Sequence, residues 1–203
     1  MWDYINFWKW KLKVENKKEH ILDDKHIETA FRKLSRILPR WQTYRPFDAS
    51  KCLQILRKSL QRISDAYDTI RGYSLLEFNE APNESLELIW HELGRTKERG
   101  GRINRTGRYY VVAICKPLML LWGQTLAYDS LVRQKAPFWM PKDCRWSFED
   151  WKRVTGEIQR YLKQNSQITD FLKKKSKEMY GTDSLVPYGE FLDYYYWCQG
   201  KCF

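Results

Sequence analysis

Apolar residues recur at three- and four-residue steps along most of this chain, and this spacing constrains its fold more than any other feature. Residues spaced in this way share one face of an α-helix. The first clear stripe stops at Pro39 and consists of Ile27, Ala30, Phe31, Leu34, Ile37 and Leu38. The second is expected to run from an N-cap at Ser50 to a stop signal at Gly72, with Leu53, Leu56, Leu60, Ile63, Tyr67 and Ile70 facing inward.

The same pattern continues through the second half of the chain. It predicts helices over about 83–98, 107–122 with a kink at Pro117, 148–164 and 170–179, a short helix after Asp129, and a closing helix with Phe191, Leu192, Tyr195 and Trp197. Ser147 and Asp150 have the spacing of a capping box. The sequence has neither the alternating pattern of strands nor an Asn-Gly hairpin. We therefore expect an all-α orthogonal helical bundle in a single domain, either undivided or formed by two lobes of about 1–82 and 83–203 with a cleft between them.

Charge and aromatic content together favour a nucleic-acid partner. The chain has 203 residues, a net charge of +11 and 16% aromatic residues. Cationic side chains attract phosphates, and aromatic faces stack on exposed bases. The five cysteines form no dense framework, and the sequence has no run of 18 apolar residues. We expect a cytoplasmic, reduced monomer that binds DNA and no membrane.

A lysine and an aspartate enclose the most apolar segment of the chain. Lys116 stands thirteen residues before Asp129, and the residues between them are almost all apolar. Apolar surroundings lower the pKa of a lysine and raise that of a carboxylate unless each finds a partner. Asp129 also stands where a helix is expected to begin. It is therefore either an N-cap alone or part of a functional pair with Lys116.

Cationic residues interrupted by glycines precede the helix that carries Lys116. Glycines let a backbone approach phosphates closely, so this stretch is either a nucleic-acid contact or a solvated loop. The candidate contacts are Arg95, Lys97, Arg99, Arg102, Arg105 and Arg108, together with Arg133 from the helix after Asp129.

Metal and cofactor chemistry has no support in the sequence. The histidines, His20, His26 and His91, have no zinc-ligand spacing, and Cys198 and Cys202 lack a second pair of ligands. Phosphate-binding and dinucleotide-binding fingerprints are also absent from the sequence. We expect neither a metal nor a cofactor.

The segment Tyr128-Asp129-Ser130-Leu131-Val132-Arg133 resembles the aspartate segment of the helix-hairpin-helix (HhH-GPD) DNA glycosylase superfamily. In that superfamily an apolar residue, Asp, a small hydroxyl residue, any residue and Val begin a helix. Degenerate relatives have Ser or Cys followed by Lys, an apolar helix, a loop and aromatic-Asp-Ser. The stretch from Cys115-Lys116 to Asp129-Ser130 is similar to that form, and the segment 192–197 looks like the closing helix of such relatives.

This resemblance covers about residues 85–135 and the last helix, and the chain departs from the superfamily at three points. The Leu-Pro-Gly-Val-Gly hairpin that grips DNA is missing, and Arg99-Gly100-Gly101-Arg102 is only a loose substitute elsewhere in the chain. The interval from lysine to aspartate is shorter than usual. No iron–sulfur set of cysteines follows.

The resemblance implies a hydrolase that excises a damaged or modified base from DNA, including modified viral DNA in phage defence. Such enzymes flip a nucleotide into a pocket with aromatic walls. The candidate walls are Trp90, Trp122, Trp139, Trp146 and Trp197. The implied role of Asp129 is to stabilise positive charge on the sugar and to orient water. Lys116 is then either an amine nucleophile or a partner of a phosphate or carboxylate.

Two other functions fit the same sequence. A non-catalytic nucleic-acid-binding helical protein needs the basic and aromatic residues but not Asp129. A protein-interaction module would use an exposed aromatic patch at the N-terminus, made of Trp2, Phe7, Trp8 and Trp10.

Overall fold

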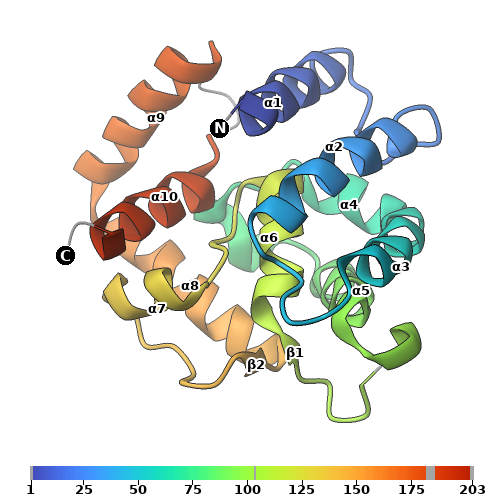
Figure 1. Cartoon of the computed structure of the whole chain (residues 1–203). Coiled ribbons are helices and arrows are strands. Elements are labelled where there is room, and N and C mark those ends of the chain that lie inside the picture. Colours follow the sequence, from blue (N-terminus) through green and yellow to red (C-terminus); the bar gives the residue numbers. More distant parts are fainter. Residues whose placement is uncertain (1, 103, 182–185, 202–203) are drawn as a thin grey trace.

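The computed structural model describes residues 2–102, 104–181 and 186–201, and these residues are mostly helical (Figure 1). The α-helices are α1 (Trp2–Glu15), α2 (Ile27–Arg40), α3 (Ala49–Arg62), α4 (Ser64–Ile70), α5 (Asn83–Gly94), α6 (Val111–Trp122), α7 (Ser130–Lys135), α8 (Phe148–Gln164), α9 (Ser166–Tyr180) and α10 (Tyr188–Lys201). Short 3-10 helices are η1 (Leu75–Glu80), η2 (Arg95–Lys97) and η3 (Arg99–Gly101). The all-α class predicted from the sequence is confirmed.

Two short strands interrupt the helical pattern. Strand β1 (Tyr109–Tyr110) pairs antiparallel with β2 (Arg145–Trp146). Because residues 109 and 110 are used in this pairing, α6 begins at Val111 and not near Gly107 as the apolar spacing predicted. Pro117 lies inside α6.

Capping side chains decide where several helices begin. At α8 the predicted capping box is confirmed: the Ser147 hydroxyl accepts from the Asp150 N–H, and the Asp150 carboxylate accepts from the Ser147 N–H. At α3 the N-cap is Asp48 and not Ser50, because the Asp48 carboxylate accepts from the N–H groups of residues 50 and 51. The single long helix predicted there is divided at Ile63 into α3 and α4.

Helix α6 runs through the middle of the molecule, with α2 to α5 on one side and α7 to α10 on the other (Figure 1). All its residues except Val112 are buried. Neighbouring core contacts are largely aromatic: Trp90 stacks on Trp151 with ring centroids 5.5 Å apart, and Phe78 meets Trp151 edge-on at 5.3 Å. This core holds the helix that carries Lys116.

The buried loop after α6 brings the chain to Asp129. Gly123 ends α6 with φ at 81°, and a Cβ there would lie 2.8 Å from Pro187. Only glycine fits both conditions. The Gln124 side chain bonds to the backbone of Leu75 and Val186, and the Trp151 indole N–H donates to Thr125 Oγ1 at 3.1 Å. These bonds fix the loop before α7 begins.

Candidate active site

The structure brings Lys116 and Asp129 together. Nζ of Lys116 lies 3.9 Å from Oδ2 of Asp129, and their side chains are 11% and 21% exposed. Lys116 comes from the middle of α6 and Asp129 from the residue before α7, so the buried loop between them folds one back towards the other. The result is a lysine–carboxylate pair that is mostly withdrawn from water but still reachable from it.

The Lys116 ammonium group is held from two sides. It donates to the carbonyl oxygen of Trp41 at 2.8 Å and faces Asp129 on the other side. Burial lowers the pKa of Lys116, and the negative charges of Asp129 and Asp193 partly oppose that effect. The lysine is therefore easier to deprotonate than a solvated lysine, while its position stays fixed.

The Asp129 carboxylate has two oxygens with separate tasks. Oδ1 accepts from the N–H groups of Leu131 and Val132, both at 3.1 Å, and so caps α7. Oδ2 faces Lys116. The carboxylate is thus both an N-cap and a member of a charged pair, and the capping bonds fix the direction of the second oxygen.

Tyr128, just before Asp129, has a strained backbone. Its φ is 52°, in the left-handed region that a bulky residue rarely adopts. The centroid of the buried Tyr128 ring lies 5.0 Å from that of the Trp146 ring, and the Tyr128 hydroxyl oxygen lies 3.1 Å from Thr155 Oγ1. Strain of this kind, about 1–2 kcal/mol, persists only where surrounding contacts determine the conformation.

A second aspartate, which the sequence reasoning did not single out, belongs to this region. Asp193 of α10 is buried, and its Oδ1 accepts from the Ala127 N–H at 2.7 Å. Burial raises the pKa of Asp193 to about 7, against the opposing effects of backbone N–H groups and Lys116. One signal in the sequence could have revealed it. Residues 189, 193 and 196 lie on one face of a helix, and that face is buried, so an aspartate on it is unusual.

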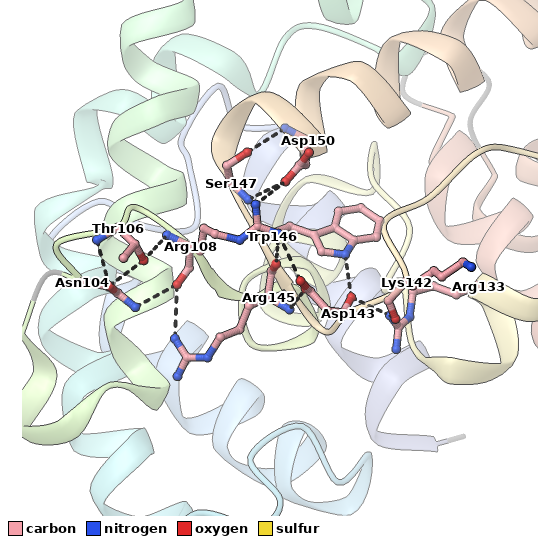
Figure 2. A network of polar contacts seen from close by, with 10 residues as sticks. All are labelled: Asn104, Thr106, Arg108, Arg133, Lys142, Asp143, Arg145, Trp146, Ser147 and Asp150. Atoms are coloured by element: carbon pink, nitrogen blue, oxygen red, sulfur yellow. Dashed lines mark hydrogen bonds and ion pairs between the residues drawn. The ribbon is translucent and has the colours of Figure 1, made fainter.

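A shallow depression of about 250 Å³ begins at the residue after Asp129. It is lined by Ser130, Arg133, Gln134, Met140, Pro141 and Lys142. Arg133 is held in its wall, because its Nη1 donates to the carbonyl oxygens of Lys142 and Asp143 at 3.3 and 2.8 Å (Figure 2). Of the two cationic side chains in the depression, Lys142 is exposed, while the Arg133 guanidinium is already bonded to backbone carbonyls.

The basic stretch between residues 95 and 108 is largely tied to the protein itself. Arg108 donates to the carbonyl of Arg145 at 2.7 Å and pairs with Asp143 and Asp150, which joins this stretch to the start of α8 (Figure 2). Arg95 pairs with Glu92 at 2.7 Å. The exposed members are Arg102 and Arg105, and the side chain of Arg99 lies outside the described residues. The stretch thus leaves fewer cations for a partner than the sequence predicted.

Lys97 is placed differently from the sequence prediction. It is buried, donates to the carbonyl oxygens of Thr43 and Arg45 at 3.3 and 2.8 Å, and lies over the rings of Phe47 and Tyr110. Burial lowers its pKa. In this position Lys97 secures the segment after α2 and is covered from any nucleic acid.

The five candidate pocket tryptophans do not converge on one cavity. Trp90, Trp122 and Trp146 have no exposed surface and belong to the core, so none of them lines an open pocket. Trp197 is partly buried against the core. Trp139 is half exposed and carries the Arg153 guanidinium 3.4 Å above its ring. Trp139 is therefore the member of the set best placed to meet a ligand.

The aromatic patch predicted at the N-terminus is also corrected. Phe7 and Trp8 are fully buried, and Trp10 packs partly against the core. The reason is that α1 is covered by other helices: it packs against α2, and Trp8 stacks on Tyr180 of α9 with ring centroids 5.5 Å apart. The side chain of Trp2 lies outside the described residues.

Among the described residues, no group of three or more His, Cys, Asp or Glu side chains could hold a metal ion. Within the same residues, none of the helices has the length and apolar character needed to cross a membrane.

Comparisons of the chain with protein-family models, with curated proteins and with solved structures find no match.

Proposed function

We propose that this protein is a DNA glycosylase that excises a damaged or modified base by hydrolysing its N-glycosidic bond. The observation that carries the proposal is the Lys116–Asp129 pair: a carboxylate and a lysine 3.9 Å apart, both largely desolvated. The segments that supply them are those that resemble the helix-hairpin-helix glycosylases. A defence role against modified viral DNA belongs to the same proposal.

The chemistry assigned to Asp129 follows from its two oxygens. Breaking the bond between C1′ and the base nitrogen sends the electron pair away with the base and leaves positive charge on the sugar. Oδ2 of Asp129, whose direction is fixed by the capping bonds of Oδ1, can stabilise that charge. The same oxygen can take a proton from the water whose oxygen then bonds to C1′.

Lys116 is assigned the role of charge partner. Its ammonium already donates to the Trp41 carbonyl and faces Asp129, which keeps that carboxylate in place. A lysine nucleophile is the competing assignment, because burial lowers the pKa of Lys116 and favours the neutral amine. The two assignments differ in whether a covalent adduct with the sugar forms.

The depression beside Asp129 supplies a binding surface for the DNA backbone. Arg133 and Lys142 line it, and a phosphate there would lie next to the reacting sugar. Exposed Arg102 and Arg105 and the Trp139–Arg153 pair add cationic and aromatic surface elsewhere.

The test uses end-labelled DNA containing either ordinary or virally modified bases, with alkali to reveal abasic sites. Asp129→Asn should abolish base release, since the amide keeps the cap of α7 but loses the charge. Asp48→Asn is the matched control: Asp48 caps α3 in the same way but faces no buried lysine, so this variant should keep full activity. Breaks that form equally with Asp129→Asn would refute the assignment.

Borohydride trapping decides the role of Lys116. Hydrolysis by water predicts no trapped protein–DNA adduct. An adduct that disappears in Lys116→Met would make the lysine the nucleophile.

Non-catalytic binding of nucleic acid is the second candidate, and the depression lined by Arg133 and Lys142 favours it equally. It predicts that DNA is bound but stays intact across the whole panel. Under that function, Asp129→Asn would leave the affinity unchanged.

A further inference from the structure

Asp193 binds a backbone N–H group that is far from it in the sequence. It is buried on α10, and its Oδ1 accepts from the N–H of Ala127, two residues before Asp129, at 2.7 Å. The backbone N–H of the next residue, Tyr128, also lowers the pKa of this carboxyl group. One buried side chain therefore holds the backbone of the loop that delivers Asp129.

Helix α10 is packed unusually closely against the same loop. A Cβ on Gly189 would lie 2.4 Å from the backbone nitrogen of Thr125, so only glycine fits there. The Gly189 N–H donates to the carbonyl of Gly123 at 3.0 Å. The start of α10 and the loop thus form one rigid unit, and Asp193 lies one helical turn beyond the point of closest approach.

The loop needs this support because Tyr128 is strained. With φ at 52°, Tyr128 turns the backbone so that the next residue, Asp129, begins α7. Without the bond to Asp193, the Ala127 N–H would lack this acceptor, and the strain at Tyr128 would favour relaxation to an ordinary conformation.

We propose that Asp193 is a positioning residue of the Lys116–Asp129 site: its carboxylate holds the backbone at Ala127 so that Oδ2 of Asp129 faces Lys116. This inference rests on the proposed glycosylase function for its catalytic consequence. The structural part, the hold on the loop, can be measured without any activity.

The charge state of Asp193 gives the proposal a signature. Burial raises the pKa of Asp193 to about 7. The titratable groups that interact electrostatically with it are Asp129, Lys116, Cys115, Tyr128 and Glu190. The ionised form is the stronger acceptor for the Ala127 N–H. Base release should therefore increase as the pH rises through about 7.

The catalytic test compares Asp193→Ala, Asp193→Asn and Glu190→Gln. Glu190 is the matched control, because it is another buried carboxyl of α10, and its side chain accepts instead from the Tyr180 hydroxyl. Asp193→Ala should lower the turnover of base release about tenfold to 100-fold, as expected for small displacements of a reacting group, with DNA affinity changed less than about twofold. Asp193→Asn, whose amide oxygen can still accept from Ala127, should recover most of the turnover and lose the increase near pH 7. Glu190→Gln should keep the wild-type turnover.

The structural test follows the amide proton of Ala127 by NMR in the free protein. A short bond to a carboxylate moves this resonance downfield, and in the wild type it should titrate with a midpoint near pH 7. In Asp193→Asn the titration should disappear. This measurement does not need a working enzyme, and Asp193→Asn preserves the shape of the side chain if Asp193→Ala does not fold.

Two results would overturn the inference. One is an Ala127 resonance that titrates identically in wild type and Asp193→Asn. The other is a folded Asp193→Ala protein with wild-type turnover. If instead the wild type releases no base while the Ala127 resonance behaves as expected, the proposed function fails and the structural hold of Asp193 stands.

Discussion

Replacing Lys97 with methionine distinguishes a structural lysine from a nucleic-acid contact. The substitution keeps most of the apolar stem and removes the charged end, which lies over the rings of Phe47 and Tyr110. It leaves the carbonyl oxygens of Thr43 and Arg45 without the ammonium that binds them.

The expected loss of stability follows from those contacts. A hydrogen bond to a charged group contributes about 1.5–3 kcal/mol, and the cation–π contacts add about 1 kcal/mol. Removing the ammonium also removes the cost of burying it, which offsets part of that sum. We expect Lys97→Met to lower the free energy of unfolding by about 3 kcal/mol.

Urea unfolding followed by circular dichroism measures this change. With an m-value of about 2 kcal/mol/M, a loss of 3 kcal/mol moves the midpoint down by about 1.5 M. Lys58→Met on the exposed face of α3 is the control, and it should change the stability by less than about 0.5 kcal/mol. DNA affinity should be equal for the wild type and folded Lys97→Met. A variant that is as stable as the wild type but binds DNA with a weaker salt dependence would refute the structural assignment.

Three further predictions concern the loop, the buried carboxyl group and the DNA surface. Gly189→Ala should lower the free energy of unfolding in urea by about 3 kcal/mol or more, because its Cβ would overlap the backbone of Thr125. Gly156→Ala inside α8 is the control: the atom nearest to its Cβ would be 3.5 Å away, so this variant should raise the free energy of unfolding by up to about 1 kcal/mol. Asp193 has a folded-state pKa of about 7, so between pH 4 and 7 the folded chain holds a proton that the unfolded chain has lost, and the free energy of unfolding falls as pH rises. Relative to Asp193→Asn, the wild type should lose about 2 kcal/mol from pH 5 to pH 7 in parallel unfolding titrations. If DNA lies across the depression near α7, Lys142→Ala should weaken DNA binding and reduce the slope of log affinity against log salt by about 0.9. Fluorescence anisotropy measures this slope, and Lys58→Ala on α3 should leave it unchanged.

Features that depend on neighbours in the sequence could be predicted from it. The capping box of α8 needs only Ser147 and Asp150, and the N-cap at Asp129 needs only the residues that follow it. The approach of Lys116 to Asp129 was also accessible, because the segment between them holds about two turns of helix and a loop that can return along it. Local signals carry this information because each is fixed within one or two helical turns.

Features that depend on distant segments could not be predicted in this way. Asp193 reaches Ala127 across 66 residues, and Lys97 reaches Thr43 across 54. A charged residue in a sequence reads as solvated until the segment that covers it is known. The tryptophans illustrate the same limit, since Trp90, Trp122 and Trp146 fill the core while Trp139 lies exposed beside Arg153.

Three of the buried ionic groups share one function, and it changes how the basic composition should be interpreted. Lys97 and Lys116 both bind backbone carbonyls of the segment from Trp41 to Arg45, and Asp193 binds the Ala127 N–H in the loop before Asp129. These side chains stabilise the two irregular segments that flank the site, where no helix satisfies the backbone. The cations left for a polyanionic partner are therefore those that the fold leaves exposed, such as Arg102, Arg105 and Lys142. In the proposed glycosylase, a net charge of +11 would attract DNA as a whole, and the placement of the few exposed cations would decide which sugar is presented to Asp129.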